Sequence, residues 1–363
     1  MTGRFQRIAI AGLGAAARTI HLPAYRKLPG VEVVGGFDPE VREGSFGFPL
    51  FSSLDEMLDR AAPDLLAVVT PPASHFELAR LGLEAGCHLF CEKPFMPTLE
   101  EAREIVELAA RVGRRVVVNN QYRFMNIHRE AKSCAAGPDF GELLFLSARQ
   151  TFYSSPQTEA GWRGGDPRRT CKEFGTHVFD LCRYFFGEDP VAITARMPKP
   201  GNPQGADFLN LIQLEFSGDR MAQITLDRLS RGRHRYLELR LDGSIGCIET
   251  RLGGGINVAF GVRGGRSRRP YLDLDVSGGG RARLFRGERF RQIATDPLDL
   301  FAQATRRLLV AFLEALESGR EPPCSAADNL RTLALMLAAY ESDRRRRRLE
   351  MIWGEWPRWR EAG

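Results

Sequence analysis

The sequence is poor in lysine and contains no Cys-x-x-Cys pair. Of its 51 basic residues only five are lysines, which leaves 46 arginines (51 − 5). Its seven cysteines are scattered, and no cluster of His, Cys or carboxylate residues has ligand spacing, so we expect no bound metal. An odd number of unpaired cysteines favours reduced thiols, and hence a cytoplasmic protein. The scarcity of lysine draws attention to Lys93, because arginine cannot serve as a titratable proton donor.

Long hydrophobic runs are also missing, which argues against a membrane-spanning helix. The first predicted strand begins near Arg7 and leaves no room for a signal peptide. With 363 residues, 43% of them hydrophobic and 26% charged, the chain is typical of a soluble protein with two domains. The net charge is +6, but the densest basic run, at 344–348, ends a predicted helix and would complement its dipole. We therefore expect no nucleic-acid partner.

The first third of the chain alternates strand and helix patterns. Short apolar runs predict buried parallel strands at 7–11, 31–37, 65–69, 88–91 and 116–118. Helical patterns lie between them at 15–28, 54–60, 74–84 and 99–112. This alternation predicts an α/β domain over residues 1–124, built as a doubly wound parallel sheet of the Rossmann type.

The end of the first strand carries Gly12-Leu13-Gly14-Ala15-Ala16-Ala17, which matches the dinucleotide pattern G-x-G-x-x-[G/A]. In this pattern Gly12 permits a tight turn and Gly14 lets the backbone approach a pyrophosphate. Ala15 and Ala16 begin the helix whose N-terminus would bind the phosphates. The motif predicts a dinucleotide site, because a strand precedes it and a helix follows.

Asp38 ends the second strand, 24 positions after Gly14 (38 − 14), near the usual offset of about 20 residues. A carboxylate at this place can bind both ribose hydroxyls and would repel a 2′-phosphate. We therefore expect NAD, with NADP less favoured. The alternative is an aspartate that only starts a turn with Pro39.

Polar residues follow the third predicted strand. Thr70 and Pro71 lie at the edge where doubly wound sheets bind ligands, and we expect them to contact the cofactor. His75 is placed to hydrogen-bond near the nicotinamide side. A solvated histidine in the first turn of a helix is the alternative.

The segment Glu92-Lys93-Pro94 ends the fourth predicted strand. Because proline cannot continue a central ladder, the chain must turn here and direct Lys93 toward the cofactor. Glu92 can hold or orient the ammonium at the edge of the cofactor site. The alternative is a surface lysine in a strand-to-helix turn.

Together these segments resemble the Gfo/Idh/MocA oxidoreductases, the family of glucose–fructose oxidoreductase and inositol dehydrogenase. The matching stretches are 10–17, 68–75, 91–94, 119–124 and 173–180. The resemblance implies a cis peptide bond between Lys93 and Pro94, which only proline makes affordable. It also places Asn120 on the nicotinamide side of the cleft and Arg123 at substrate or inter-domain contacts. A polar domain linker is the alternative for these two residues.

Glu173 and His177 stand i, i+4 on a predicted helix, so their side chains can share one face. In the family this segment carries an Asp and a His that work with the lysine; here His177 matches and Glu173 replaces the usual Asp. The resemblance implies that His177 is the general base, that Lys93 stabilises the developing alkoxide, and that Glu173 orients one of them. Asp180, one turn further, is assigned to the substrate site. A structural histidine is the alternative for His177.

Beyond residue 124 the pattern changes to longer amphipathic strands, predicted at 143–153, 192–197, 208–216, 220–229, 236–241 and 246–250. Helices are predicted at 127–136, 297–318 and 325–342. These elements predict an α+β domain over residues 125–345 with a large, mostly antiparallel open sheet. The glycine-rich segment 253–280 predicts a long mobile hairpin region, and the tryptophan-rich tail, 346–363, would pack on its own domain or a neighbour's.

The resemblance further implies that one face of this sheet lines the active site and the other forms a homodimer or homotetramer. The resulting hypothesis is an NAD-dependent dehydrogenase that transfers a hydride between the carbinol of a sugar, polyol or sugar derivative and nicotinamide. Two alternatives remain, an NAD-dependent glycosidase that oxidises its substrate transiently and a non-catalytic NAD-binding sensor. The presence of both Lys93 and His177 argues against the sensor, because a sensor needs no proton relay.

The segment before the catalytic helix also predicts a feature of the substrate. It carries Trp162, Arg163, Arg168 and Arg169 where the family has a run of glycines, and Tyr153 precedes it in the substrate site. Guanidinium groups bind carboxylate or phosphate, and an indole can stack on a sugar. We expect a preference for an acidic sugar, such as a uronate or sugar phosphate. Solvated loop residues are the alternative.

Overall fold

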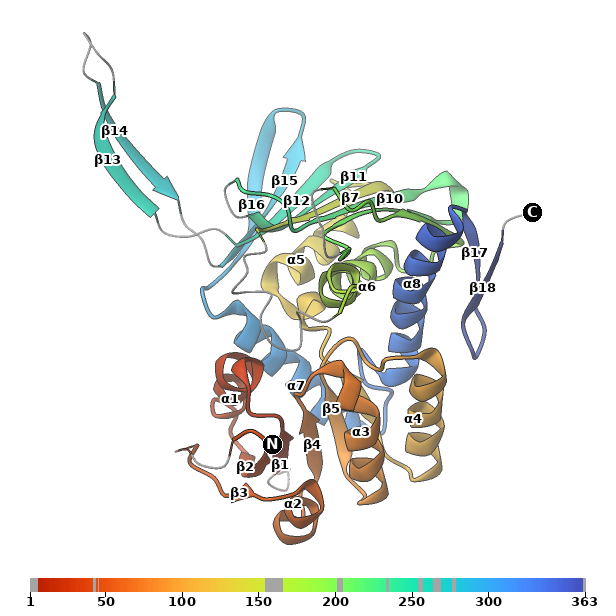
Figure 1. Cartoon of the computed structure of the whole chain (residues 1–363). Helices are drawn as coiled ribbons and strands as arrows, with labels where there is room; N and C mark the ends of the chain where they lie inside the picture. Colours follow the sequence, from red (N-terminus) through yellow and green to blue (C-terminus); the bar gives the residue numbers. More distant parts are fainter. Residues whose placement is uncertain are drawn as a thin grey trace.

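The computed structural model describes residues 6–41, 44, 46–153, 166–200, 205–232, 235–253, 257–263, 269–275 and 279–361, with the backbone alone for 257–263 and 269–275. The chain forms two layered units. A compact α/β unit, at the bottom of Figure 1, carries a broad open sheet above it, and helices fill the space between the two sheets.

The first unit is a six-stranded parallel sheet with the strand order β3-β2-β1-β4-β5-β6. Its strands are β1 (Gln6–Ala11), β2 (Val31–Phe37), β3 (Leu50–Phe51), β4 (Leu65–Val68), β5 (His88–Cys91) and β6 (Val116–Val118). Helices cover both faces: residues 15–16 with η1 (Ala17–His21) and α1 (Leu22–Tyr25), α2 (Leu54–Ala61), η2 (Pro72–Ser74) with α3 (His75–Glu84), and α4 (Leu99–Arg111). All residues of β4 and β6 are buried, as strands covered on both faces require. The predicted Rossmann fold is confirmed.

The second unit contains a ten-stranded sheet with the order β16-β15-β12-β11-β7-β10-β9-β8-β17-β18. Its strands are β7 (Leu143–Thr151), β8 (Ala192–Arg196), β9 (Leu209–Glu215), β10 (Met221–Asp227), β11 (Arg235–Gly243), β12 (Cys247–Leu252), β15 (Gly280–Arg286), β16 (Arg289–Asp296), β17 (Leu349–Ile352) and β18 (Arg358–Glu361). Only β7 and β10 pair in parallel, so the predicted, mostly antiparallel open sheet is confirmed.

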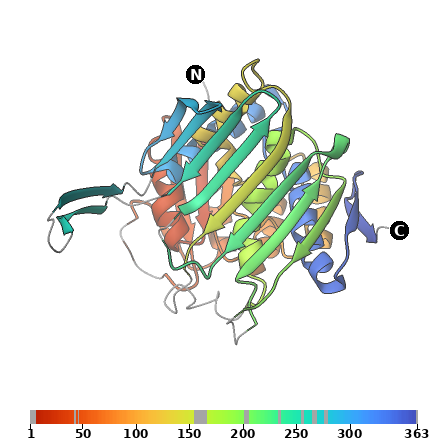
Figure 2. The same cartoon turned by 90° about the horizontal axis from the view of Figure 1, so that it is seen from above.

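Helices lie against one face of this sheet, as Figure 2 shows from above. They are α5 (Asn126–Ala135), η5 (Cys171–Gly175), α6 (Thr176–Phe186) and α8 (Ala326–Arg345), while η3 (Gln121–Phe124) and α7 (Leu300–Ser318) pack on other helices. Burial alternates along β10, because one face of each strand packs on these helices and the other faces outward. The segment after β12 forms a hairpin of β13 (Asn257–Arg263) and β14 (Arg269–Asp275), which pair with each other (Figure 1).

The two units are tied together by the C-terminal helices. Helix α7 packs on η1, α1 and η3, and α8 packs on both α4 and α6. Between these helices the chain runs antiparallel to β6: the amide of Val118 donates to the carbonyl of Cys324 at 2.9 Å, and Val117 bridges Ser325. The edge of the first sheet is therefore completed by residues that follow the second sheet in the sequence.

The tryptophan-rich tail packs on its own domain. Strands β17 and β18 extend the open sheet beyond β8, and Trp353 Nε1 donates to the carbonyl of Pro190 at 2.7 Å. Of the two alternatives that the sequence left open, packing on the tail's own domain or on a neighbouring subunit, the structure shows packing on its own domain.

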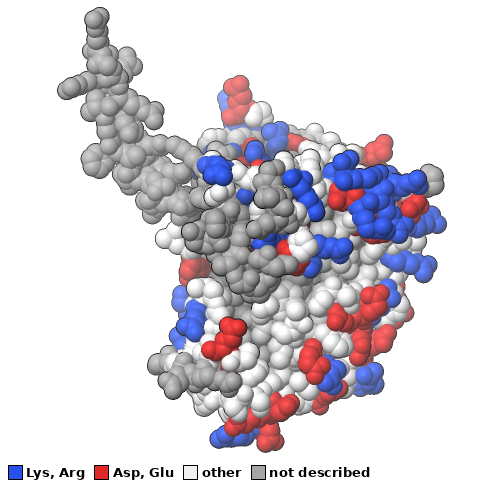
Figure 3. All heavy atoms as spheres, viewed as in Figure 1, with Lys and Arg blue, Asp and Glu red and all other residues white. Residues whose placement is uncertain are grey.

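The basic run at the end of α8 is neutralised within the fold. Figure 3 shows blue side chains gathered where α8 ends and the last two strands begin. Each arginine of the run is paired with a carboxylate: Arg344 and Arg345 with Glu341, Arg346 with Asp343, Arg347 with Glu361, and Arg348 with Glu215. The expectation that the run ends a helix is confirmed. No helix among the described residues is long and apolar enough to cross a membrane.

Candidate active site

The dinucleotide loop is closed on one side and open on the other. Gly12 has a φ of +96°, and a Cβ there would lie 2.4 Å from the carbonyl oxygen of Val69. A Cβ on Gly14, by contrast, would meet no atom within 4 Å. The open side of Gly14 lies at the start of the helix formed by residues 15–25, where backbone N–H groups point outward. The loop thus leaves open space beside Gly14, as the approach of a pyrophosphate to the backbone would require.

Asp38 lies beside the same loop. Its Oδ2 accepts the amide of Leu13 at 2.7 Å, and its Oδ1 accepts the amide of Glu40 at 2.9 Å. These contacts fix the carboxylate at the end of β2, next to the phosphate loop, where a ribose would lie. Arg18 donates to the carbonyl of Leu13 at 2.8 Å and lies over the ring of Phe46.

The turn after β5 brings Lys93 to the second unit. The Lys93–Pro94 bond is cis, as the resemblance implied. Lys93 Nζ donates to the backbone carbonyl of Glu173 at 2.8 Å, in the π-helical turn η5. A side chain from the Rossmann domain is thereby joined to the segment that carries His177.

Glu92 forms the base of this turn. Its Oε1 accepts Asn119 Nδ2 at 2.7 Å and lies 2.8 Å from His21 Nε2, while its Oε2 accepts the amide of Lys93 at 3.1 Å. Burial raises the pKa of Glu92, but the hydrogen bond and charge of His21, the charge of Lys93 and the Asn119 amide outweigh it and bring the pKa to about 2. Glu92 therefore holds the backbone of Lys93 as an ionised carboxylate. His21 Nδ1 contacts the hydroxyl of Tyr25 at 2.8 Å.

His75 lies beneath the same turn. It is fully buried, and its Nδ1 lies 3.1 Å from the carbonyls of both Pro94 and Phe95, while its Nε2 lies 2.9 Å from the carbonyl of Thr70. Burial lowers its pKa, so the imidazole is neutral near pH 7. The alternative of a solvated histidine is wrong, because the side chain is fully buried. His75 supports the backbone of the turn that carries Lys93, and its expected place near the nicotinamide side stays a prediction.

His177 stands at the start of α6 and is 3% exposed. Its ring is stacked on Tyr122, with 3.8 Å between centroids and an interplanar angle of 5°. Burial, and then the charge of Lys93, lower its pKa well below the usual value, although Glu92 opposes the shift. Its Nδ1 has no hydrogen-bond partner among the described residues. The imidazole is therefore neutral and close enough to Lys93 to sense its charge.

Glu173 does not hold His177 in this structure. Its carboxylate pairs with Arg228 Nη2 at 2.5 Å, and Arg228 is 3% exposed, over the rings of Phe152 and Phe174. Glu173 was expected to orient either His177 or Lys93, and its carboxylate lies in this buried ion pair. Its backbone carbonyl accepts the ammonium of Lys93.

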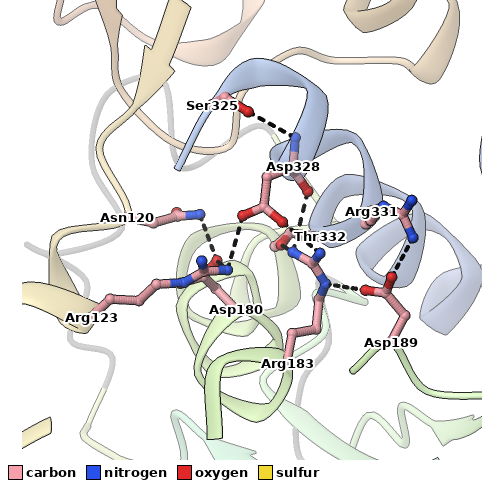
Figure 4. A network of polar contacts seen from close by, with 9 residues as sticks. All are labelled: Asn120, Arg123, Asp180, Arg183, Asp189, Ser325, Asp328, Arg331 and Thr332. Atoms are coloured by element: carbon pink, nitrogen blue, oxygen red, sulfur yellow. Dashed lines mark hydrogen bonds and ion pairs between the residues drawn. The ribbon is translucent and has the colours of Figure 1, made fainter. Parts of the chain in front are cut away.

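Asn120, Arg123 and Asp180 form a buried network, shown in Figure 4. Asp180 is fully buried and accepts Asn120 Nδ2 at 2.9 Å and two nitrogens of Arg123 at 2.7 and 2.6 Å. Arg123 also pairs with Asp328 on α8, so the network joins η3, α6 and α8. The expectation that Asp180 contacts substrate is corrected, since its oxygens are bound by protein groups. Of the two contacts expected for Arg123, the inter-domain one is present.

The network continues along α8. Arg183 donates to Asp189 and Asp328, and Asp189 is shared with Arg331. Asn120 Oδ1 is buried and has no hydrogen-bond partner among the described residues. The amide oxygen thus remains available, while the amide nitrogen serves the network.

Three further residues that were predicted for the site, Thr70, Pro71 and Tyr153, are described by the structure. The hydroxyl of Thr70 accepts Ser74 Oγ at 2.8 Å, Pro71 is exposed at the same strand end, and Tyr153 bridges Leu229. Trp162 and Arg163 lie outside the described residues.

Arg168 and Arg169 are directed toward aromatic rings. The guanidinium of Arg168 lies 5.3 Å from the ring centroid of Tyr340, and that of Arg169 lies 5.1 Å from that of Phe208. Arg169 is only 2% exposed, which corrects the reading of it as a solvated loop residue. The expected preference for an acidic sugar stays a prediction.

Several site residues carried no signal in the sequence. Arg228 follows β10 at a position typical of the end of an amphipathic strand, and Tyr236 is the second residue of β11. Tyr122 lies within a stretch that matched the family, but only the fold reveals its stacking on His177. His21 lies on the helix after the dinucleotide motif, where helical spacing alone indicates a core residue. In the described part of the chain, no three His, Cys, Asp or Glu residues are grouped to hold a metal.

Comparisons with known proteins identify the family of both domains. Residues 6–120 match the family model described as the oxidoreductase family with an NAD-binding Rossmann fold, and residues 128–249 match the GFO/IDH/MocA C-terminal domain. The fold and the site therefore define an NAD-binding oxidoreductase. The chain belongs to the Gfo/Idh/MocA family, as its motifs predicted.

Relatives match over nearly the whole chain. D-apiose dehydrogenase of Paraburkholderia graminis is 25% identical, over 94% of this chain and 89% of that one. Inositol 2-dehydrogenase of Rhizobium meliloti is 22% identical, over 97% of this chain and 100% of that one. An oxidoreductase from Agrobacterium radiobacter, solved with NAD⁺, L-tartaric acid and magnesium, superposes with a TM-score of 0.80 at 18% identity, over 95% of this chain and 98% of that one.

Proposed function

We propose that this enzyme oxidises a carbinol carbon of a sugar, polyol or sugar derivative with NAD, and that Lys93 and His177 perform the proton chemistry. The observation that carries this proposal is the contact of Lys93 with the carbonyl of Glu173, because it brings an ammonium beside a neutral, buried imidazole. The named relatives act on a pentose and on inositol, which supports a polyhydroxylated substrate.

NAD, when bound, supplies the hydride acceptor. The backbone of Gly12 to Ala16 would hold its pyrophosphate, and the Asp38 carboxylate would bind the adenosine ribose. Thr70, Pro71 and Asn120 would lie toward the nicotinamide half, where the amide oxygen of Asn120, which has no partner among the described residues, would accept a hydrogen bond. The expected cofactor is NAD rather than NADP because Asp38 would face the ribose.

The two catalytic residues divide the work. His177 takes the hydroxyl proton as general base, and its neutral state means that no proton must first be lost near pH 7. Lys93 places a positive charge beside the developing alkoxide. The carbonyl of Glu173 holds the ammonium in place, and the Glu173–Arg228 ion pair holds η5, so Glu173 is a positioning residue rather than the orienting partner of His177.

Assembly is proposed from the outer face of the open sheet. Phe145 on β7 and Leu211 on β9 are 37% and 40% exposed, and a homodimer or homotetramer through this face would cover them. The seven free cysteines support a reducing compartment such as the cytoplasm.

The test is NADH formation from a panel of sugars and polyols. We expect steady NADH with the true substrate, its abolition in Lys93→Met with NAD binding nearly intact, and a rate lower by about 10²–10⁴ in His177→Ala. Near-wild-type turnover in both variants would refute the proposed site. Glycoside cleavage without net NADH would instead identify the transient-oxidation enzyme, and ligand binding without turnover would identify a sensor.

A further inference from the structure

The aromatic ring of Tyr122 lies flat on the imidazole of His177. The two ring centroids are 3.8 Å apart, and the ring planes differ by 5°. We propose that Tyr122 is a positioning residue for the reaction, whose π face holds the imidazole in place and stabilises the positive charge that the imidazole carries once it has taken the substrate proton. A carboxylate commonly has this task beside a catalytic histidine. The inference rests on the function proposed above, in which His177 is the general base.

The surroundings of His177 oppose the charge that a general base acquires. The side chain is 3% exposed, so an imidazolium would lose most of its water. Burial, and then the ammonium of Lys93, hold the pKa of His177 well below its usual value. Glu92 opposes this shift, but its oxygens already contact His21 and Asn119. A further group has to stabilise the imidazolium, because a base that cannot hold a proton cannot remove one from a hydroxyl.

Two other carboxylates near His177 are bound by arginines. Glu173 pairs with Arg228, and Asp180 accepts two nitrogens of Arg123. The imidazole Nδ1 has no hydrogen-bond partner among the described residues. What the structure does place against the imidazole is the electron-rich face of an aromatic ring, and such a face attracts a cation within about 6 Å of its centroid.

Tyr122 is itself held so that its face stays against the imidazole. It is 1% exposed, its hydroxyl donates to the hydroxyl of Tyr236 at 3.0 Å, and the ring of Phe301 packs on it at 5.8 Å between centroids. His128 also stacks on Tyr122, at 6.5 Å, but burial lowers the pKa of His128 to about 4. His128 therefore brings no second positive charge to the ring near pH 7, and the ring can respond to the charge of His177.

The experiment removes the ring and the hydroxyl of Tyr122 separately and follows the pKa of His177 by NMR with isotope-labelled histidine. The chain has only six histidines, and His177→Ala identifies the signal. Tyr122→Phe keeps the π face, so we expect an unchanged pKa. Tyr122→Leu should lower the pKa of His177 by about one pH unit, as the loss of a desolvated cation–π contact implies. Phe301→Leu, the same change in a ring that packs on Tyr122, is the control and should leave the pKa unchanged.

The pH profile of turnover provides a second readout. In Tyr122→Leu the acid limb of kcat/KM should move to lower pH by the same amount and the plateau should fall several-fold, whereas Tyr122→Phe should keep both. If Tyr122→Leu does not fold, phenylalanine analogues with increasing numbers of fluorine atoms at position 122 replace it. They keep the ring and weaken its π face, so the pKa of His177 should fall with each added fluorine.

Several outcomes overturn the inference. One is a pKa of His177 that neither Tyr122→Leu nor ring fluorination lowers, and another is an equal shift in Phe301→Leu or in Tyr122→Phe. A third is an imidazole that stays neutral in the wild type down to the pH at which the protein unfolds. Because the titration needs no turnover, the two proposals can fail separately. If no sugar or polyol yields NADH while the pKa still follows the ring, the proposed function fails and the effect of Tyr122 on His177 stands. If NADH forms and the pKa does not follow the ring, only the inference fails.

Discussion

The acidic and basic residues around the turn that carries Lys93 differ in charge state. Glu92 stays ionised, because donors from three directions hold its oxygens and bring its pKa to about 2. His75 and His177 are held neutral by the same burial, which removes the water that an imidazolium needs. The turn thus contains one fixed negative charge and one ammonium, with neutral imidazoles on either side.

Asp38 should decide the choice of cofactor. A 2′-phosphate would meet its carboxylate, so we expect NAD to bind about tenfold or more tighter than NADP, as repulsion of more than about 1 kcal/mol implies. Asp38→Ser should narrow this gap. Calorimetric titration with both nucleotides measures it, and Glu40→Ser, an exposed carboxylate two residues on, is the control. Equal binding of both nucleotides by the wild type would show that Asp38 does not discriminate.

His128 on α5 should make the protein less stable in acid. Burial lowers the pKa of His128 from 6.5 to about 4. The Nδ1 of His128 lies 2.8 Å from the backbone carbonyl oxygen of Tyr122. Between pH 6.5 and about pH 4, the imidazole of His128 binds a proton in the unfolded chain but not in the folded chain. The free energy of unfolding therefore falls as pH decreases from 6.5 to about 4, by up to about 1.4 kcal/mol per pH unit from this residue alone.

Urea unfolding at pH 7 and pH 5 measures the effect. In His128→Asn, whose amide can still donate to Tyr122, the loss of stability between the two pH values should be smaller than in the wild type by about 2 kcal/mol. This comparison removes the contribution of the carboxylates, which titrate in both proteins. An equal loss in both would mean that His128 is protonated in the folded state.

At the scale of elements, η5 is held by a buried ion pair. Removing one partner of the Glu173–Arg228 pair leaves an uncompensated charge, so Glu173→Gln and Arg228→Met should each cost about 3 kcal/mol of stability. The double variant should lose less than the sum, which denaturant unfolding of all four proteins measures. Additive losses would show that the pair is not coupled.

Turnover provides a second readout for the same variants. Because Lys93 is held by the backbone carbonyl of residue 173, Glu173→Gln should keep its rate within about tenfold of the wild type, well above Lys93→Met. If Glu173→Gln lost as much turnover as Lys93→Met, the side chain of Glu173 would have to take part in the reaction itself.

The strength of the local signal decided which elements could be predicted. Strands β1, β4, β5 and β6 are short apolar runs between helical patterns, and the sequence placed each within a residue or two. Strands β15 and β16 were missed, because arginines alternate through both and β16 is largely exposed. The last two strands were missed as well, since β17 pairs with β8, more than 150 residues away, and β18 joins the sheet only through β17.

The same contrast holds within the site. Lys93, Asp38 and the glycine loop stand in motifs formed by their neighbours in the sequence, so their places at the ends of the strands could be predicted from the sequence. The pairing of Glu173 with Arg228, and of Asp180 with Arg123, joins residues more than 50 positions apart. No local pattern reports such contacts. The role of Glu173 and the burial of Asp180 could be learned only from the fold.

The whole molecule should unfold as one unit. The edge of the first sheet is completed by Cys324 and Ser325, and α7 and α8 each pack on both units. All four tryptophans lie at positions 162, 353, 356 and 359, outside the Rossmann domain. NAD at 100 times its dissociation constant stabilises the folded state by about 2.7 kcal/mol.

Tryptophan fluorescence should therefore report a ligand bound in the other domain. We expect NAD to raise the melting temperature seen by fluorescence and by far-ultraviolet circular dichroism equally, by a few degrees. NADP at the same concentration is the control and should shift both less. Two independent units would be demonstrated if NAD left the melting temperature seen by fluorescence unchanged and divided the circular dichroism curve into two transitions.

The seven cysteines have a practical consequence for chemical labelling. Cys91 adjoins the catalytic turn, yet it is fully buried and burial raises the pKa of its thiol, so electrophiles meet neither an accessible nor an ionised sulfur. Only Cys134 and Cys247 are partly accessible. A maleimide dye would attach to helix α5 or to strand β12, and slowly, because the pKa of both thiols is raised, that of Cys247 to about 12. We expect the labelled protein to keep its activity, since neither cysteine adjoins Lys93.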